Sequence, residues 1–316
     1  MSDIPLIDIS AAMKGGRKDK VEVAEQISNA CRDIGFFTIK GHGIDKKMIN
    51  EAYENAWAFF ALEREQKEMC RREDGEKRVC VHQFDGYSAL LEESADALMG
   101  REVQCQDYVE KFGMGRWLLD DDKNMPFPQD ALGITMRKNM KAYYEACLNL
   151  THVLTELMAI AAGLPDDFFV DKIDNSLDFM RFQHYPQVTG NTEYDKGISE
   201  HTDPNFLTIL TGTSGRLEVE TKSGEWVNGA TEEVDHFVVN VGDLMMRWSN
   251  DEWLSNVHRV ALADKERMSL IFFKVVNEDA VIEAFDKFCT EGKPRKYEKV
   301  IFSQYMNAKA AALYGS

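Results

Sequence analysis

The sequence lacks several features that would each define a class of protein. It contains no apolar run long enough to cross a membrane, and its start, Met1-Ser2-Asp3-Ile4-Pro5, lacks the basic residues and apolar core of a secretory signal. It also has no internal repeat and no low-complexity tract. We therefore expect a chain that neither spans a membrane nor is exported.

The cysteines follow no metal-binding or disulfide pattern. The sequence has six, without Cys-x-x-Cys spacing: Cys31, Cys70, Cys80, Cys105, Cys147 and Cys289. This scatter suggests neither a zinc knuckle nor a disulfide framework. A reducing compartment suits such a chain, and we expect it to be cytoplasmic.

Basic residues are fewer than acidic ones. The chain has 37 Lys and Arg against 54 Asp and Glu, a formal net charge of −17. An acidic chain repels nucleic-acid phosphates and anionic lipids. The best basic cluster, residues 293–296, has no interleaved aromatic residue and is typical of a solvated loop. We expect a small-molecule substrate, with no nucleic-acid or membrane partner; the sequence leaves the oligomeric state open.

Apolar periodicity divides the chain into two kinds of structure. Apolar residues at helical spacing predict helices at about residues 18–31 and 48–60 and a long one within 130–163. After Pro165, short apolar segments alternate with glycine turns, a rhythm typical of a jelly roll. With 316 residues and 44% hydrophobic content, the chain can bury a large core. We predict one mixed α/β domain, mainly helical over 1–165, with a jelly-roll catalytic core over 166–316 backed by the long helix.

His201, Asp203 and His258 form a candidate metal site. Residues two apart on a strand face the same way, so His201 and Asp203 can point at one ion while His258 comes from a distant strand. Two imidazoles and one carboxylate leave positions open on Fe(II) for dioxygen and a co-substrate. A lone His-x-Asp arises by chance, and a hydrogen-bonded histidine or a turn carboxylate beside Pro204 is the simpler alternative. The strand-like surroundings favour the metal site.

Arg267 and Ser269 form a candidate carboxylate site. They too are two apart, so they can present a guanidinium and a hydroxyl on one strand face. Arginine binds a carboxylate through paired charge-assisted hydrogen bonds, and the distal carboxylate of 2-oxoglutarate is a natural ligand. The alternative is a surface arginine paired with Glu266 or Asp264, but the apolar segment 270–273 that follows favours a buried position.

Further motifs occur in a consistent order along nearly the whole chain. They are Ile4-Pro5-Leu6-Ile7-Asp8, the segment 33–44, Asp85-Gly86-Tyr87, Phe112-Gly113, His184-Tyr185-Pro186 and the segment 239–244. With the His/Asp/His set and Arg267-x-Ser269, they resemble the 2-oxoglutarate- and Fe(II)-dependent oxygenases of the isopenicillin N synthase-like group.

The resemblance implies a double-stranded β-helix fold, a reaction and residue roles. His201, Asp203 and His258 would bind Fe(II), and Arg267 and Ser269 would anchor 2-oxoglutarate. Tyr185 would give 2-oxoglutarate a further hydroxyl donor, unless it is a core tyrosine satisfied elsewhere. Dioxygen and 2-oxoglutarate would be consumed, with release of succinate and CO2. The substrate would be a small, amino-acid-derived metabolite of specialised metabolism, oxidised at an unactivated C–H bond by hydroxylation, desaturation or ring closure.

Substrate-binding candidates are the residues close to these motifs in sequence. They are Phe182, Gln183, Asn205, Phe206 and Phe273, each of which could equally belong to the core. Where the family commonly has Gly-Leu-Gln-Val, this chain has Arg216-Leu217-Glu218-Val219. Arg216 could therefore hold a substrate carboxylate, although an ordinary loop arginine is slightly favoured.

Three other functions are compatible with the motifs. An iron oxidase of the same fold would not consume 2-oxoglutarate and would use Arg267 and Ser269 for its substrate. A zinc hydrolase is disfavoured because Glu200, the nearest general base, would point away from His201 on the opposite strand face. A non-catalytic metabolite-binding protein would retain the same ligands.

Overall fold

Two β-sheets form the centre of the molecule. The computed structural model describes residues 4–71, 85–119, 126–190, 194, 196–212, 215–231 and 233–314. An eight-stranded sheet has the order β1-β2-β10-β7-β12-β5-β4-β3, and a four-stranded sheet has the order β6-β11-β8-β9. The larger sheet contains β1 (Leu6–Asp8), β2 (Phe36–Lys40), β3 (Gly86–Ser88), β4 (Glu110–Gly115), β5 (Phe179–Tyr185), β7 (Leu207–Gly212), β10 (Phe237–Val241) and β12 (Arg267–Lys274). The smaller contains β6 (Lys196–His201), β8 (Leu217–Glu220), β9 (Trp226–Asn228) and β11 (His258–Ala261).

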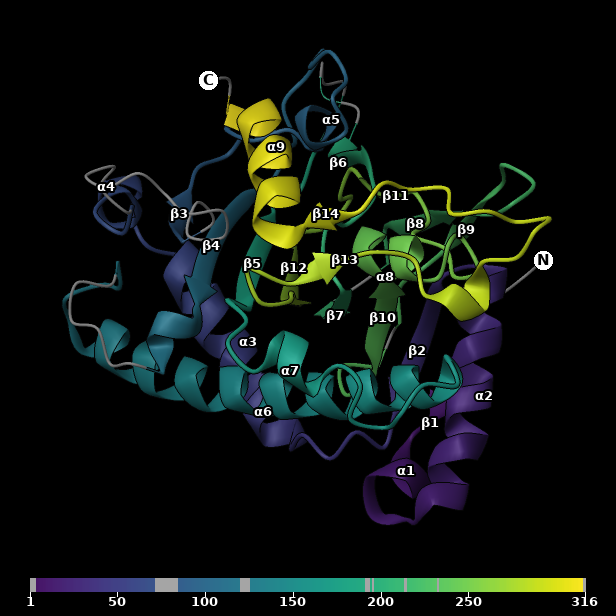
Figure 1. The fold of residues 1–316 in the computed structure, drawn as a ribbon. Helices are drawn as coiled ribbons and strands as arrows, with labels where there is room; N and C mark the ends of the chain where they lie inside the picture. Colours follow the sequence, from purple (N-terminus) through teal and green to yellow (C-terminus); the bar gives the residue numbers. More distant parts are fainter. Residues whose placement is uncertain are drawn as a thin grey trace.

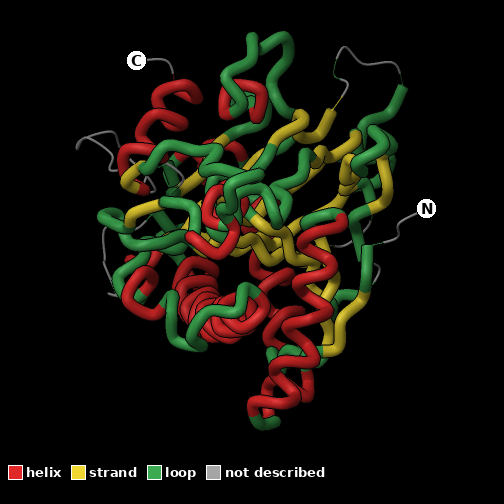
Figure 2. The backbone as a smooth tube through the Cα atoms, turned by 45° about the vertical axis from the view of Figure 1, so that its right-hand side comes forward, coloured by secondary structure: helices red, strands yellow, loops and turns green. Residues whose placement is uncertain are grey.

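Helices cover the outer face of the larger sheet. The longest, α6 (Ala131–Ala161), packs against α2 (Arg17–Asp33), α3 (Lys46–Phe60) and β12. In Figure 1, α6 runs beneath the strands, and Figure 2 shows the helices gathered on that side. Asp130 begins α6 by accepting a hydrogen bond from the Gly133 amide, and Gly163, with a φ of 62°, follows its end.

The remaining elements are short and peripheral. They are α1 (Ser10–Lys14), α4 (Arg64–Glu68), α5 (Ala95–Leu98), α7 (Val170–Ile173), α8 (Asp243–Trp248), α9 (Phe302–Tyr314) and a small sheet of β13 (Val281–Ile282) with β14 (Val300–Ile301). Of these, α9 packs against α5 on the side of the molecule away from α6 (Figure 1).

The predicted fold class is confirmed, but the division at residue 165 is not a structural boundary. The three predicted helices correspond to α2, α3 and α6. Four strands of the larger sheet, β1 to β4, come from the part predicted to be mainly helical. Strands β1, β3 and β4 were not predicted. Leu6–Asp8 and Gly86–Ser88 have three residues each, and Glu110–Gly115 contains glycine and charged residues rather than a β-branched alternation.

Strand β5 lies between β12 and β4, and its register fixes what faces the interior. Tyr185 pairs with Arg267, and Gln183 pairs with both Ser269 and Lys111. Directly opposed residues project from the same face, so these side chains share the concave side. Phe182, the neighbour of Gln183 in the sequence, points the other way, into the hydrophobic core.

The described residues bear on two predictions from the sequence, one about membrane-spanning helices and one about the cysteines. No helix among them is long and apolar enough to cross a membrane. Their five cysteines are all free thiols, while Cys80 lies outside the described residues.

A buried ion pair joins the start of β5 to the end of β12. Lys274 Nζ lies 2.8 Å from Asp178 Oδ2, and both side chains are at most 2% exposed. Because Asp178→Asn would leave the Lys274 charge unpaired, we expect it to lower the free energy of unfolding by about 3 kcal/mol in denaturant titration. Asp171→Asn removes a pair of the same length whose acid is 80% exposed, and should cost less than about 1 kcal/mol. Equal losses of unfolding free energy in the two variants would contradict the stabilising role of the buried ion pair.

Candidate metal centre and adjoining cavities

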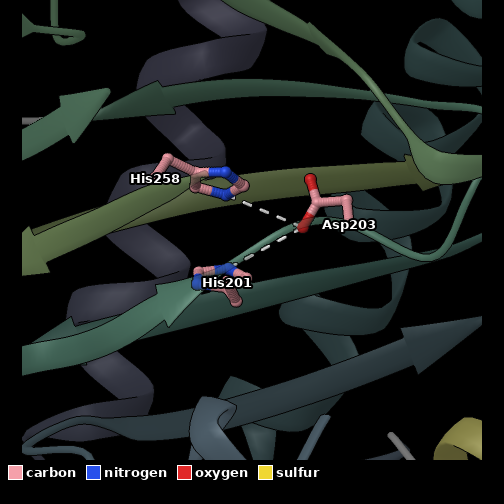
Figure 3. A group of neighbouring side chains, drawn as sticks. All are labelled: His201, Asp203 and His258. Atoms are coloured by element: carbon pink, nitrogen blue, oxygen red, sulfur yellow. Dashed lines mark ion pairs between the residues drawn. The ribbon is translucent and has the colours of Figure 1, made fainter. Parts of the chain in front are cut away.

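Three predicted ligands converge between the two sheets. His201 ends β6 and His258 begins β11, and the two are paired directly across the strands. Asp203 follows β6, and its Oδ1 lies 3.7 Å from the Nε2 atom of each histidine (Figure 3). The ligand atoms all lie within 4.8 Å of one another. This spacing can accommodate one metal ion with two imidazoles and a carboxylate on one side.

Hydrogen bonds to the protein orient all three groups. His201 Nδ1 lies 2.8 Å from the Ser199 carbonyl oxygen and His258 Nδ1 lies 3.2 Å from that of Asn256. A carbonyl oxygen only accepts, so each Nδ1 carries the hydrogen and each Nε2 presents a lone pair to the centre.

Asp203 is held through its outer oxygen. Its Oδ2 accepts hydrogen bonds from Thr208 Oγ1 at 2.6 Å and Asn240 Nδ2 at 2.7 Å, which leaves Oδ1 facing the histidines. The Asp203 carbonyl also accepts from the Asp243 amide. Gly242 permits this close packing, because a Cβ there would lie 2.1 Å from the Asn205 carbonyl oxygen.

The electrostatic setting favours the protonation states that metal binding requires. Burial, followed by the neighbouring His201, lowers the pKa of His258 to about 4, and burial also lowers the pKa of His201. Burial alone would raise the pKa of Asp203, but the two histidines and its hydrogen bonds hold it below the usual value. Near neutral pH the site therefore offers two neutral imidazoles and one carboxylate.

Arg267 lies beside this centre with unused hydrogen-bonding capacity. Its guanidinium is buried, donates from Nη2 to Ser269 Oγ at 2.8 Å, and lies 4.3 Å from the centre of the Tyr185 ring. Its Nε and Nη1 have no hydrogen-bond partner among the described residues. A cavity of about 450 Å³ links Arg267, Ser269 and Tyr185 to all three predicted metal ligands. Unpaired buried donors are costly, so this cavity suits an anionic oxygen ligand.

A second cavity, of about 680 Å³, opens on the other side of the centre. It shares His201 and Asp203 with the first. The other lining residues include apolar side chains, such as Phe179 and Met306, and two basic ones, Lys111 on β4 and Arg181 on β5. One ligand at Arg267 and a second molecule in this cavity would thus meet at the same metal.

The structure separates the predicted substrate residues into two groups. Gln183, Asn205 and Phe273 line the larger cavity. Phe182 and Phe206 do not; both are fully buried in the hydrophobic core. Phe182 faces the core because it alternates with Gln183 along β5.

Arg216 also lies away from both cavities. Its side chain is 40% exposed and pairs with Asp264 at 2.5 Å. This agrees with the loop-arginine alternative and gives no support to a carboxylate clamp at Arg216. Its φ of 108° lies in the region that favours glycine, the residue common at this position in the family that the chain resembles.

Several site residues were missed by the sequence analysis. Lys111 and Arg181 line the larger cavity, and Arg181 shares the strand face of Gln183 and Tyr185, so period-two alternation could have revealed it. Asn240, a lone amide within the apolar strand β10, was a similar signal. Glu93 and Asp107 lie outside strands and helices, where no periodicity marks them.

Comparison with known proteins agrees with this geometry. A family model described as "non-haem dioxygenase in morphine synthesis N-terminal" matches residues 4–131, and one described as "2OG-Fe(II) oxygenase superfamily" matches residues 176–275. The second match contains the three predicted ligands together with Arg267 and Ser269.

Individual relatives extend the similarity over nearly the full length. The 2-oxoglutarate-Fe(II) type oxidoreductase ppzC of Metarhizium rileyi is 27% identical over 99% of this chain and 88% of its own. A homoarginine-6-hydroxylase of Glycine max is 28% identical over 98% of this chain and 96% of its own. A full-length Neurospora crassa protein crystallised with α-ketoglutarate and thymine has a TM-score of 0.82 at 27% identity, covering 98% of this chain and 96% of that one.

The chain belongs to the family of 2-oxoglutarate- and Fe(II)-dependent oxygenases. It is a dioxygenase, and its cofactor and co-substrates are Fe(II), 2-oxoglutarate and dioxygen. The predicted jelly roll is that of its structural relatives.

The hydrogen bond from Thr208 to Asp203 should tune metal affinity. Thr208→Val keeps the shape but removes this donor, so Asp203 loses one of two restraints on its orientation. We expect divalent-metal binding, measured by calorimetry with Mn(II), to weaken about 10- to 100-fold. Thr211→Val is the matched control on the same strand, because buried Thr211 donates instead to the Val234 carbonyl oxygen. Comparable losses in both variants would contradict the role of Thr208.

Proposed function

We propose that His201, Asp203 and His258 bind Fe(II) and that Arg267 and Ser269 hold the distal carboxylate of 2-oxoglutarate. The observation that carries this proposal is the buried Arg267 guanidinium, whose Nε and Nη1 have no partner among the described residues and which lines one cavity with the three ligands. A bound carboxylate would satisfy these donors in the bidentate geometry that arginine favours.

For Tyr185 we propose two contributions. Its ring lies under the Arg267 guanidinium, at 4.3 Å, and so supports the cation. Its hydroxyl donates to Gln183 Oε1 at 2.6 Å, so it would donate to 2-oxoglutarate only after releasing Gln183. Because Gln183 lines both cavities, this exchange would link co-substrate binding to the wall of the substrate cavity.

The protein's own contribution is placement and shielding. Bound iron supplies the oxidising chemistry, as 2-oxoglutarate is converted to succinate and CO2. The protein holds 2-oxoglutarate through Arg267 in one cavity and the substrate in the other, so that a C–H bond lies near the iron and away from bulk water. Whether the product is hydroxylated, desaturated or cyclised depends on where the reacting carbon of the substrate lies relative to the iron.

We further propose that the substrate is a small, amino-acid-derived metabolite and that residues 1–316 act as one catalytic unit in the cytoplasm. The larger cavity combines apolar side chains with a few convergent charged and polar groups, a lining typical of small-molecule sites. Relatives named for homoarginine hydroxylation or crystallised with thymine support a small substrate. The sharing of one sheet by strands from both halves supports the single unit.

Succinate formation tests this function directly. Protein loaded with Fe(II) and 2-oxoglutarate, then exposed to air with a panel of amino-acid-derived compounds, should form succinate faster when a substrate is present. His258→Ala should abolish that stimulation because only two ligands remain. Substrate oxidation without succinate would instead indicate an oxidase that does not use 2-oxoglutarate.

Arg267 should be required for co-substrate affinity. We expect Arg267→Gln to weaken 2-oxoglutarate binding about 100-fold in anaerobic calorimetry, because two charge-assisted hydrogen bonds are lost. Arg259→Gln is the control. Arg259 lies on β11, outside both cavities, and forms ion pairs with Glu218 and Glu200. Unchanged affinity in Arg267→Gln would refute the anchoring role.

A further inference from the structure

A charged cluster forms one wall of the larger cavity. Its members are Glu93, before α5, Lys111 on β4 and Arg181 on β5. All three side chains are less than 10% exposed. Buried charged side chains in proteins are usually paired or functional, so this cluster is a candidate functional feature of the cavity.

The Glu93 carboxylate is fully occupied. Oε1 accepts hydrogen bonds from Arg181 Nη2 at 2.9 Å and Ser88 Oγ at 2.9 Å. Oε2 accepts from Arg181 Nη1 at 2.9 Å and Lys111 Nζ at 2.8 Å. A carboxylate offers about four acceptor positions, and all four are taken. Glu93 therefore has no capacity to bind a substrate cation, and serves to hold the two basic groups in place.

Lys111 has donors to spare. Its ammonium carries three N–H groups, and the described residues provide one acceptor for it, Glu93 Oε2. Lys111 lines the same cavity as the predicted ligands His201 and Asp203. Asp107 also lines this cavity, and each of its oxygens accepts a backbone amide, from Ala95 and from Ser199. The two remaining N–H groups of Lys111 can therefore donate to an acceptor on a ligand.

The opposite side of the cavity is apolar. Phe179 and Phe273 stack with ring centres 4.6 Å apart, and Val275 and Met306 continue this surface. Met306 comes from α9 and is buried. A ligand that satisfies both walls has an anionic oxygen group at one end and an apolar body at the other.

We propose that the substrate is a carboxylic acid whose carboxylate binds Lys111, beside Arg181, while its apolar body lies against Phe179 and Phe273. The proposal rests on the proposed function and narrows its substrate class. It assigns to Lys111 the role of binding the substrate carboxylate, which was considered for Arg216 from the sequence. A substrate carboxylate would accept the remaining N–H groups of Lys111 in charge-assisted hydrogen bonds, which are stronger than neutral ones.

Matched acids and amides test the proposal without knowledge of the natural substrate. Hexanoate is compared with hexanamide and phenylacetate with phenylacetamide, by ligand-observed NMR at millimolar concentrations. The protein is kept anaerobic with Fe(II) and saturating 2-oxoglutarate, so that the Arg267 cavity is filled. We expect each acid to bind about 10- to 100-fold more tightly than its amide, the gain given by a buried charge-assisted hydrogen bond.

Lys111→Met should reduce this acid-to-amide ratio to near one. Lys67→Met is the matched control, because the Lys67 side chain is only 11% exposed, pairs with Glu110 at 2.8 Å and lies outside the cavity. If Lys111→Met fails to fold, Lys111→Gln decides: it keeps a polar donor beside Glu93 without the charge, and should also bring the acid-to-amide ratio near one.

The outcomes separate this proposal from the function on which it rests. Absence of 2-oxoglutarate binding in the unmodified protein counts against the proposed function. Normal 2-oxoglutarate binding with equal acid and amide affinities, or with no acid binding, overturns the carboxylate proposal alone. An acid preference that survives Lys111→Met or Lys111→Gln overturns it as well.

Discussion

The antiparallel register between β5 and β12 is the constraint on which the site depends. It places Tyr185 opposite Arg267, Gln183 opposite Ser269 and Phe179 opposite Phe273, all on the concave face. If β5 slipped by one residue against β12, Tyr185, Gln183 and Phe179 would turn into the core and Phe182 would face the cavities. The fully buried pair Lys274–Asp178 at the far end of both strands helps to exclude such a slip.

Buried charged groups around the site differ in how completely they are hydrogen-bonded. Glu93 is saturated by Lys111, Arg181 and Ser88, and Asp203 has one oxygen bound and one presented to the histidines. Arg267 has two nitrogens without a partner among the described residues, and the Lys111 ammonium has one acceptor there for its three N–H groups. Buried polar groups are normally satisfied, so these two basic groups mark where ligands belong, whereas the saturated groups hold the site rigid.

Much of the site was predictable because its residues follow strand periodicity. The spacing of His201 with Asp203, and of Arg267 with Ser269, indicated shared faces, and the structure brings all of them together with His258. The same rule, applied to β5, would have preferred Arg181 over Phe182. Glu93, Asp107 and Met306 could not have been found this way, since tertiary packing alone brings their loops and α9 to the cavity. For Arg216 the favoured interpretation, an ordinary loop arginine, agrees with its exposed ion pair with Asp264.

Part of the wall of the larger cavity comes from outside the stretch of sequence that contains the predicted metal ligands. Residues 176–275 contain the metal-binding triad, Arg267 and Ser269, whereas Glu93 and Lys111 come before this stretch and Met306 after it. Changes in the flanking stretches can therefore alter which molecule is admitted while the oxidising apparatus stays intact. Exchange of the central stretch alone between two members would replace Phe179, Arg181 and Phe273 but leave Glu93, Lys111 and Met306 in place, so the hybrid cavity would combine walls from two proteins.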